Sequence, residues 1–478
     1  MMANSRLLLP QPARERSLVS TALGYAGGML VMAGPWFFMV LGLGGVSAVA
    51  CGGRSCAAVD LVRSVFIYNT AFSLVTGGAI AFVAARLVAD DVIAGRRERL
   101  LTITLGACGA YAVIAAAFGA PFYLFTVTAD AGFKVLALFN LMVLGQAWLL
   151  VAITGALKQP DLNAPVEPPS ESLGGARWVA AAFALGAAAT IAGAAGSDGE
   201  AGALLNAITA GVAIASAVMF WRIVRECGAS LVERRGLIAA AVAHWELAAI
   251  GFCYYVGLWA DKLIMWRLAP AGQLEVAGAL RTLPDYDAAM FWAQLTVAPV
   301  LGVFAVHMHN DFHGVWRGFY GRLNSHASLR ELNLAVEAIQ RFVLSSLVVL
   351  FAAAAFIGAF AILGSFVAID AVGLQAQQMG ILRNAFVGVV FHTSVMFVLV
   401  FLLYLELKRS ALIVAAAFLV LNAFGTLAAL HFGFVAYGLG FAGAGALAFA
   451  LAIVVLARQL RWLPYHAFVT NNPSVANV

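Results

Sequence analysis

Charged side chains are scarce in this sequence, and this scarcity restricts its structural class more than any other property. Only 11% of the 478 residues are Asp, Glu, Lys or Arg, whereas 63% are hydrophobic. A water-soluble domain with this balance would leave too much apolar surface in contact with water. The composition therefore excludes an ordinary soluble protein and predicts a chain that lies largely in a lipid bilayer.

Several patterns that mark common activities are also missing. No Gly-Lys-Ser/Thr phosphate-binding loop occurs, so the chain should not hydrolyse ATP by itself. Neither a nucleophile elbow nor a zinc-protease motif is present. The net charge is only +5, without a basic patch interleaved with aromatic residues, so we expect no nucleic-acid binding.

Metal-binding and disulfide patterns are equally sparse. Of the five cysteines, only Cys51 and Cys56 lie close together, on a predicted outer loop where they either pair or remain free thiols. His307, His309 and His313 are spaced like metal ligands, but no cysteine or well-placed carboxylate completes a tetrahedral set. We therefore expect no metal site and no cofactor.

Long hydrophobic runs are the dominant positive feature. Runs of about twenty apolar residues can cross a bilayer as α-helices, which pair all their backbone groups internally. Such runs occupy 20–47, 64–85, 100–125, 135–157, 178–196, 201–221, 238–260, 288–306, 342–364, 384–405, 411–430 and 434–457. The sequence predicts an all-α polytopic membrane protein with about twelve transmembrane helices.

The distribution of basic residues predicts the orientation of these helices. Most of the 28 Lys and Arg residues fall at the two termini or in the even-numbered connections. By the positive-inside rule, these segments face the cytoplasm. The N-terminus is not a convincing secretory signal, because Pro10 interrupts its short apolar core. We expect the first helix to be retained and both termini to be cytoplasmic.

Two six-helix halves are the expected organisation, as in many transporters. The predicted parts are a cytoplasmic N-terminus at 1–19, a bundle at 20–223, a cytoplasmic connection at 224–237, a bundle at 238–458 and a cytoplasmic tail at 459–478.

The segment 307–341 in the second half has aromatic and apolar residues at three- and four-residue steps. This pattern predicts an amphipathic helix at the cytoplasmic surface. It either anchors the chain at the lipid interface or docks a partner protein.

Polar residues gather around the connection between the seventh and eighth runs. They are Asp261, Lys262, Arg281, Asp285, Tyr286 and Asp287, accompanied by Trp259 and Trp266. Charges at membrane-length segments are costly unless they are paired, hydrated or functional. The predicted cluster either binds substrate or a proton at the outer end of a cavity, or locks the two helices together. Asp60 and Arg63, one helical turn apart, should pair and line the same cavity.

Residues 254–292 also resemble the signature of a known family. The matching positions are Tyr255, Gly257, Asp261, Lys262, Trp266, Pro284, Tyr286, Asp287 and Phe291, with Ala33-Gly34-Pro35-Trp36 in the first run. This pattern is similar to that of the PelG family, which belongs to the multidrug/oligosaccharidyl-lipid/polysaccharide (MOP) flippase superfamily. The resemblance implies a MATE/flippase-like fold with two six-helix bundles around a central cavity.

The resemblance also implies a function, namely export of a hexosamine-rich, partly cationic exopolysaccharide across the bacterial inner membrane. Implied partners are membrane lipid, a cytosolic glycosyltransferase and other Pel-type inner-membrane subunits. If the substrate is cationic, Asp261, Asp285 and Asp287 are the expected contacts, and Lys262 balances them when the site is empty.

Two other interpretations remain open. The chain could be a lipid-linked oligosaccharide flippase or a cation-coupled drug exporter of the same superfamily. It could also be a polytopic membrane glycosyltransferase, although its outer connections are short and poor in acids and histidines. We therefore expect a transporter rather than an enzyme.

Overall fold

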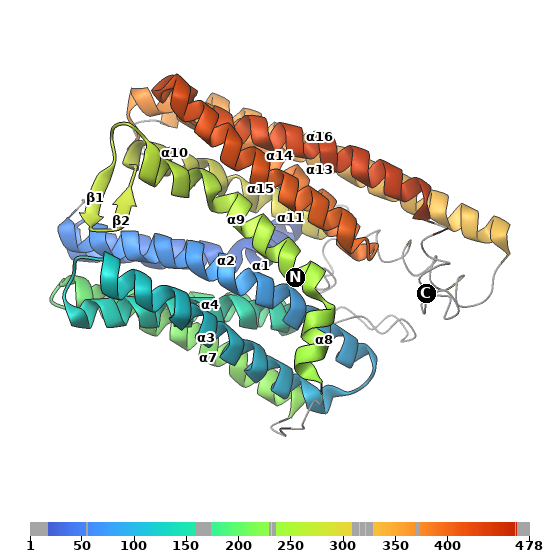
Figure 1. Ribbon diagram of the computed structural model, residues 1–478, viewed down its shortest axis with the longest axis horizontal. Helices are drawn as coiled ribbons and strands as arrows, with labels where there is room; N and C mark the ends of the chain where they lie inside the picture. Colours follow the sequence, from blue (N-terminus) through green and yellow to red (C-terminus); the bar gives the residue numbers. More distant parts are fainter. Residues whose placement is uncertain are drawn as a thin grey trace. The chain divides into compact units, whose positions relative to one another are not determined.

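Long α-helices make up most of the computed structural model, which describes residues 18–53, 56–157, 174–228, 231, 236–307, 315, 321, 328–368, 373–463 and 465 (Figure 1). The α-helices are α1 (Leu18–Cys51), α2 (Ala57–Ile93), α3 (Leu100–Thr126), α4 (Ala131–Ala156), α6 (Gly174–Ala195), α7 (Ala201–Cys227), α8 (Leu237–Ala243), α9 (Trp245–Leu268), α10 (Pro284–Leu295), α11 (Val297–His307), α13 (Leu329–Ala368), α14 (Met379–Tyr404), α15 (Lys408–Phe432) and α16 (Leu439–Arg461). Short 3-10 turns are η3 (Arg97–Arg99), η5 (Ala376–Gln378) and η6 (Phe434–Ala436), and the strands are β1 (Leu274–Ala277) and β2 (Leu280–Thr282).

The predicted number of spans is confirmed. Within the described part of the chain, 12 helical segments are long and apolar enough to cross a membrane. One span consists of α10 and α11 together, while α8 is too short to count. The fold is therefore that of a polytopic helical membrane protein.

The chain divides into two compact units, Met1–Asp287 and Ala288–Val478, so that the division falls inside α10. The connection at 224–237, where we expected the boundary, lies earlier in the sequence. The difference arises because α9, the expected start of the second half, packs along α2 within the first unit. Two glycines allow this close packing: a Cβ on Gly251 would lie 2.7 Å from the Gly78 carbonyl oxygen, and a Cβ on Gly78 would overlap the Tyr255 ring.

The same packing order recurs in both units. In the first unit α3 packs on α4, α4 on α7 and α6 on α7, while in the second α13 packs on α14, α14 on α16 and α15 on α16. Glycines bring the last helix pair into backbone contact each time, through Gly186 and Gly211 in one unit and Gly425 and Gly440 in the other. These glycine pairs are residue-level signs of an internal repeat.

A buried polar network joins four helices of the first unit. The Asn69 amide of α2 donates to the Asn140 side-chain oxygen of α4 at 2.9 Å and accepts from the Tyr123 hydroxyl of α3 at 2.5 Å. Asn140 in turn donates to the Thr209 hydroxyl of α7 at 2.9 Å. Because each of these groups has a partner, the network can be buried without a large desolvation cost.

Two predicted runs are interrupted. The seventh breaks at His244, between α8 and α9, and α9 continues to Leu268 rather than ending near 260. The eighth starts at Pro284 and breaks at Thr296, where Pro299 lacks the N–H that would bond to Leu295 and its ring would collide with that carbonyl. Pro299 thus explains this break, whereas Pro35 and Pro121 lie inside continuous helices.

Cys51 and Cys56 form a disulfide across the short connection between α1 and α2. This resolves the alternative that the sequence left open. Three parts lie outside the described residues: 1–17 of the predicted N-terminus at 1–19, nearly all of 308–327 within the predicted amphipathic segment 307–341, and nearly all of the tail after 463.

Candidate functional site

The candidate site lies where α9 reverses direction into α10. A small antiparallel hairpin makes this reversal, with Leu274 opposite Thr282 and Glu275 opposite Arg281. Figure 1 shows the hairpin at one end of the first unit, beside the start of α10. The sequence analysis predicted only a connection here, so the two strands are an addition to the all-α expectation.

Glycine at the hairpin turn fastens the reversal to α3. Gly278 has φ +60°, and a Cβ at this position would lie 2.5 Å from the carbonyl oxygen of Thr126. The next residue, Ala279, donates its backbone N–H to the same oxygen at 2.8 Å. Only glycine combines this left-handed conformation with so close a backbone approach.

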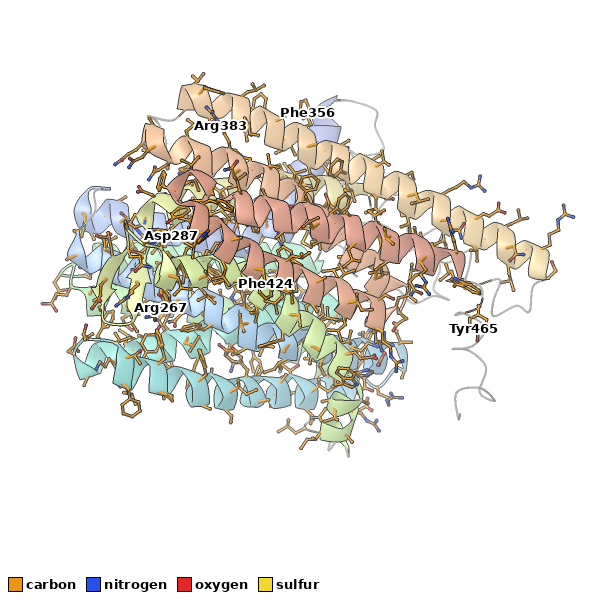
Figure 2. The ribbon with its side chains drawn as sticks, turned by 45° about the horizontal axis from the view of Figure 1, so that its top comes forward. Arg267, Asp287, Phe356, Arg383, Phe424 and Tyr465 are labelled. Atoms are coloured by element: carbon orange, nitrogen blue, oxygen red, sulfur yellow. A yellow bond between two sulfur atoms is a disulfide. The ribbon has the colours of Figure 1, made fainter. Side chains whose placement is uncertain are left out.

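The end of α9 is held to the hairpin as well. The Arg267 guanidinium donates to the Ala279 carbonyl at 2.9 Å, and the Gln273 amide donates to the Met265 carbonyl at 3.1 Å. Figure 2 shows Arg267 and Asp287 at this same end of the first unit. The last two turns of α9 therefore have a fixed position relative to the start of α10.

Asp261 is the most deeply buried acid of the cluster, with a side chain that is 0% exposed. Its Oδ2 accepts from the Tyr286 hydroxyl at 2.7 Å and lies 3.1 Å from the Lys262 ammonium nitrogen. Tyr286 is 25 residues away in sequence and is itself fully buried. An isolated carboxylate would be very costly in this environment, and these two partners offset that cost.

Asp287 connects α10 to α9 through a different pair of bonds. The Trp266 indole N–H donates to both of its oxygens, at 2.8 and 2.9 Å. The Leu283 backbone N–H donates to Oδ2 at 2.9 Å, directly before Pro284 opens the helix. Asp287 thus satisfies the Leu283 N–H at the start of α10, where the next residue, Pro284, has no N–H of its own.

Tyr68 of α2 completes this cluster, and the sequence analysis did not select it. Its ring stacks on Trp266, with centroids 4.6 Å apart and planes 20° from parallel. Its hydroxyl donates to the Arg281 carbonyl at 2.8 Å and accepts from the Arg281 N–H at 3.1 Å. Its only sequence signal is a phenol next to Asn69 in an apolar run.

Arg281 and Asp285 lie apart from the contacts that Asp261 and Asp287 make. The Arg281 guanidinium pairs at 3.1 Å with Glu275 on the opposite strand, and both side chains are substantially exposed. Asp285 is the second residue of α10 and only partly buried, where a negative charge favours the helix start. The structure therefore brings Asp261, Lys262, Tyr286, Asp287 and Trp266 together, while the Arg281 side chain pairs within the hairpin.

Trp259 lies one turn before Lys262 on α9. The Lys262 ammonium nitrogen is 5.6 Å from its ring centroid, within cation–π range. The Trp259 indole nitrogen is buried and donates to no acceptor among the residues that the structure describes.

Asp60 and Arg63 pair as predicted, at 3.5 Å near the start of α2. That they line a substrate cavity remains a prediction. Within the described ranges no three metal-binding side chains come together. His307 instead hydrogen-bonds Ser346 at 2.8 Å, and His309 and His313 lie outside those ranges.

Solved structures with a similar fold are transporters of the MATE and MOP groups. A MATE protein in the bent conformation has 15% identity and a TM-score of 0.62, covering 97% of this chain and 99% of that chain. A MOP superfamily transporter from Pyrococcus furiosus has 14% identity and a TM-score of 0.62, covering 96% and 98%. A MATE protein in complex with MaD3S has 13% identity and a TM-score of 0.63, covering 97% and 99%. At these identities the likeness establishes the fold alone.

No curated protein matches the sequence. A family model does match, however, and it spans residues 9–468, which is nearly the whole chain. That family is PelG, described as "Putative exopolysaccharide Exporter (EPS-E)". Family and fold together are those of a membrane transporter rather than an enzyme. The chain therefore belongs to the PelG family of exopolysaccharide exporters.

Proposed function

We propose that this exporter moves a hexosamine-rich, partly cationic polysaccharide across the bacterial inner membrane, with both termini in the cytoplasm. The observation that supports a cationic substrate is the charge balance of the cluster. Asp261 and Asp287 contribute two carboxylates, whereas Lys262 is the one ammonium group that contacts either of them in the described part of the chain. This excess of negative charge favours a positively charged ligand.

Asp261 is the carboxylate that we assign to the substrate. Its present cation, Lys262, has a long flexible side chain that is 13% exposed and can withdraw towards water. An ammonium group of an amino sugar would then replace Lys262 while the Tyr286 hydroxyl keeps its hydrogen bond. An uncharged sugar could not replace Lys262 in this way, because the buried Asp261 carboxylate would then have no positively charged partner.

Asp287 has a positioning role in this proposal. Both of its oxygens accept from Trp266, and one also accepts from the Leu283 N–H. This acid therefore fixes the start of α10, so that Tyr286, one residue earlier, can reach Asp261. Asp285, which is more exposed, would meet cationic units before they reach the buried pair.

Trp259 supplies the group suited to a sugar ring. Its indole N–H has no acceptor in the described residues, so a sugar hydroxyl would satisfy it. Trp259 and Trp266 are tilted at 51° with centroids 6.3 Å apart, and because the buried Trp266 stacks on Tyr68, Trp259 is the ring that we assign to an apolar sugar face.

The proposed partners follow from family membership. An exporter of a polymer needs a cytosolic glycosyltransferase that supplies the chain, and other Pel-type inner-membrane subunits would couple synthesis to export. Membrane lipid would surround the twelve candidate spans.

Asp261→Asn tests the exchange role directly. We expect secreted amino-sugar polymer to fall roughly tenfold or more, a change equivalent to about 1.4 kcal/mol, while the amount of protein in the membrane stays the same. Lys262→Gln is the matched variant, because it removes the resting partner but keeps the carboxylate for substrate. It should retain more export than Asp261→Asn at equal abundance.

A purely structural ion pair would give a different pattern. Both variants would then lose membrane protein to a similar degree, and export per molecule would be unchanged. Accumulation of an undecaprenyl-linked intermediate in the deletion strain would instead identify a lipid-linked oligosaccharide flippase.

A further inference from the structure

The second unit contains a cavity that the transport proposal does not use. It lies between the start of α15 and the end of α16 and has a volume of about 360 Å³. Its lining residues are Ser410, Ile413, Val455, Arg458, Gln459, Trp462 and Tyr465. Figure 2 labels Tyr465 at the end of this helix pair. A volume of this order accommodates a small ligand or a lipid headgroup.

Hydrogen-bond donors line one part of this cavity. Arg458 is exposed and Gln459 half-buried, one residue apart on α16. Ser410, which also lines the cavity, is only 7% exposed. A guanidinium, an amide and a hydroxyl together suit the oxygens of an anion, and the guanidinium matches phosphate in charge and shape.

The other part of the cavity is apolar, and its side chains are exposed on the surface of the second unit. Ile413 is 55% exposed, Trp462 58% and Tyr465 62%, although Ile413 belongs to a membrane-spanning helix. The Trp462 and Tyr465 rings make an edge contact at 6.3 Å. Exposed Trp and Tyr at the end of a span are typical of the level of lipid headgroups. A ligand here would combine an anionic group with acyl chains.

We propose that this cavity binds the headgroup of an anionic phospholipid of the phosphatidylglycerol class. The phosphate would contact Arg458 and Ser410, and the acyl chains would run along Ile413 towards the bilayer centre. Outside the cavity lining, Lys408 opens α15, where it pairs with Glu406 at 3.6 Å, and Arg461 ends α16. Basic residues at this end place it at the cytoplasmic leaflet by the positive-inside rule, and that leaflet carries anionic lipid.

The first unit offers an internal comparison at the equivalent helix pair. There the end of α7 also carries arginines next to tryptophans; Arg222 is partly buried, whereas Arg225 is exposed. Arg222 pairs with Glu226 and lies 5.9 Å from the Trp178 ring centroid, and Arg225 lies 5.1 Å from that of Trp221. In the second unit the arginine at this level, Arg458, lines a cavity together with the buried Ser410.

Native mass spectrometry of the purified full-length protein would test this assignment. The protein is titrated separately with phosphatidylglycerol, phosphatidylethanolamine and phosphatidylcholine that carry identical acyl chains. We expect phosphatidylglycerol to bind most tightly. Arg458→Gln should weaken its binding about fivefold, the fold-change that corresponds to about 1 kcal/mol for one arginine near an anionic headgroup. Ser410→Ala should weaken it in the same direction.

Arg225→Gln is the matched control, since it removes the same charge from the equivalent helix end of the first unit. It should leave phosphatidylglycerol binding within twofold of the unchanged protein. The thermal unfolding midpoint without added lipid, measured for all variants, separates loss of a ligand contact from loss of folding. Trp462→Leu provides a second variant should Arg458→Gln unfold.

Three results would overturn the proposal. Equal affinity for the three lipids would remove the role of the anionic group. An equal loss in Arg225→Gln and Arg458→Gln would show general charge attraction without a specific cavity. Displacement of the lipid by soluble glycerol phosphate at similar concentration would identify a site for free phosphate esters. None of these results depends on which polymer the protein exports.

Discussion

Trp266 connects three helices at the candidate site. It lies on α9, stacks on Tyr68 of α2 and donates its indole N–H to Asp287 of α10. It is also among the largest fully buried side chains in the described structure. A residue with an apolar body and one donor is well suited to a buried carboxylate, because it satisfies the acid without adding a second charge.

Trp266→Phe should destabilise the protein by about 1.5–3 kcal/mol, the usual cost of losing a hydrogen bond to a charged group. The phenyl ring can still stack on Tyr68, but of the donors to Asp287 described above only the Leu283 N–H would remain. Thermal or denaturant unfolding in detergent would measure the change.

Trp259→Phe is the control, because the Trp259 indole N–H has no acceptor in the described residues. The loss of stability in this variant should stay below about 1 kcal/mol. Equal losses in both variants would contradict the importance of the indole bond.

The residues of this site were only partly predictable from sequence. Asp261, Lys262, Trp266 and Asp287 stood out because charges are rare in apolar runs and their spacing matches a family pattern. Tyr68 did not, because its partner Arg281 is 213 residues away and contacts it through backbone atoms. A contact that uses only backbone atoms of a residue does not restrict which amino acid occupies that position, so the sequence does not reveal it.

Pairs of helices in both units approach one another through glycines. In the second unit α15 and α16 cross at Gly425 and Gly440, and each glycine lies against the backbone of the other. Without a hydrophobic driving force between helices in lipid, such close van der Waals packing is an important source of association. Many of the 47 glycines have no such contact, so glycine content alone does not identify the crossings.

Gly440→Ala and Gly443→Ala form a matched pair within α16. A Cβ on Gly440 would lie 2.5 Å from the Gly425 carbonyl oxygen, whereas a Cβ on Gly443 meets nothing within 4 Å. We expect Gly440→Ala to cost about 1–3 kcal/mol of stability by forcing the helices apart. Gly443→Ala should be neutral or stabilising by up to about 1 kcal/mol, because alanine favours the helix. Unfolding midpoints of the two variants would decide; a loss of the same size in both would exclude the crossing as the cause.

Element boundaries illustrate what hydropathy can and cannot predict. The apolar runs identified every span, because bilayer thickness sets a minimum run length. The breaks at His244 and Thr296 and the hairpin at 274–282 were missed as elements. A window of about twenty residues averages over a single-residue break. The hairpin at 274–282 is too short to show a clear alternation of apolar and polar residues.

At the scale of the whole molecule, sidedness connects the sequence to function, because an exporter has a direction. The positive-inside pattern predicts that the connection between α1 and α2 faces outward and that the end of α7 faces the cytoplasm. The disulfide between Cys51 and Cys56 agrees with the first assignment, since disulfides persist in the oxidising periplasm and are rare in the cytosol. Cys227, the last residue of α7, is a free and partly exposed thiol at the opposite predicted side.

These cysteines allow the orientation to be measured. In cells with a permeabilised outer membrane, an impermeant maleimide should label neither Cys51 nor Cys56 until a mild reductant is added, after which both should react. Cys227 should react only after the inner membrane is broken, because its side of the membrane is closed to the reagent. Cys227→Ser and the double variant Cys51→Ser with Cys56→Ser assign each signal by mass. Labelling of Cys227 in intact spheroplasts, with protection of the other two cysteines, would show that the topology is the reverse of the predicted one. The basic end of α15 and α16 would then lie outside, away from the anionic leaflet that the proposed lipid site requires.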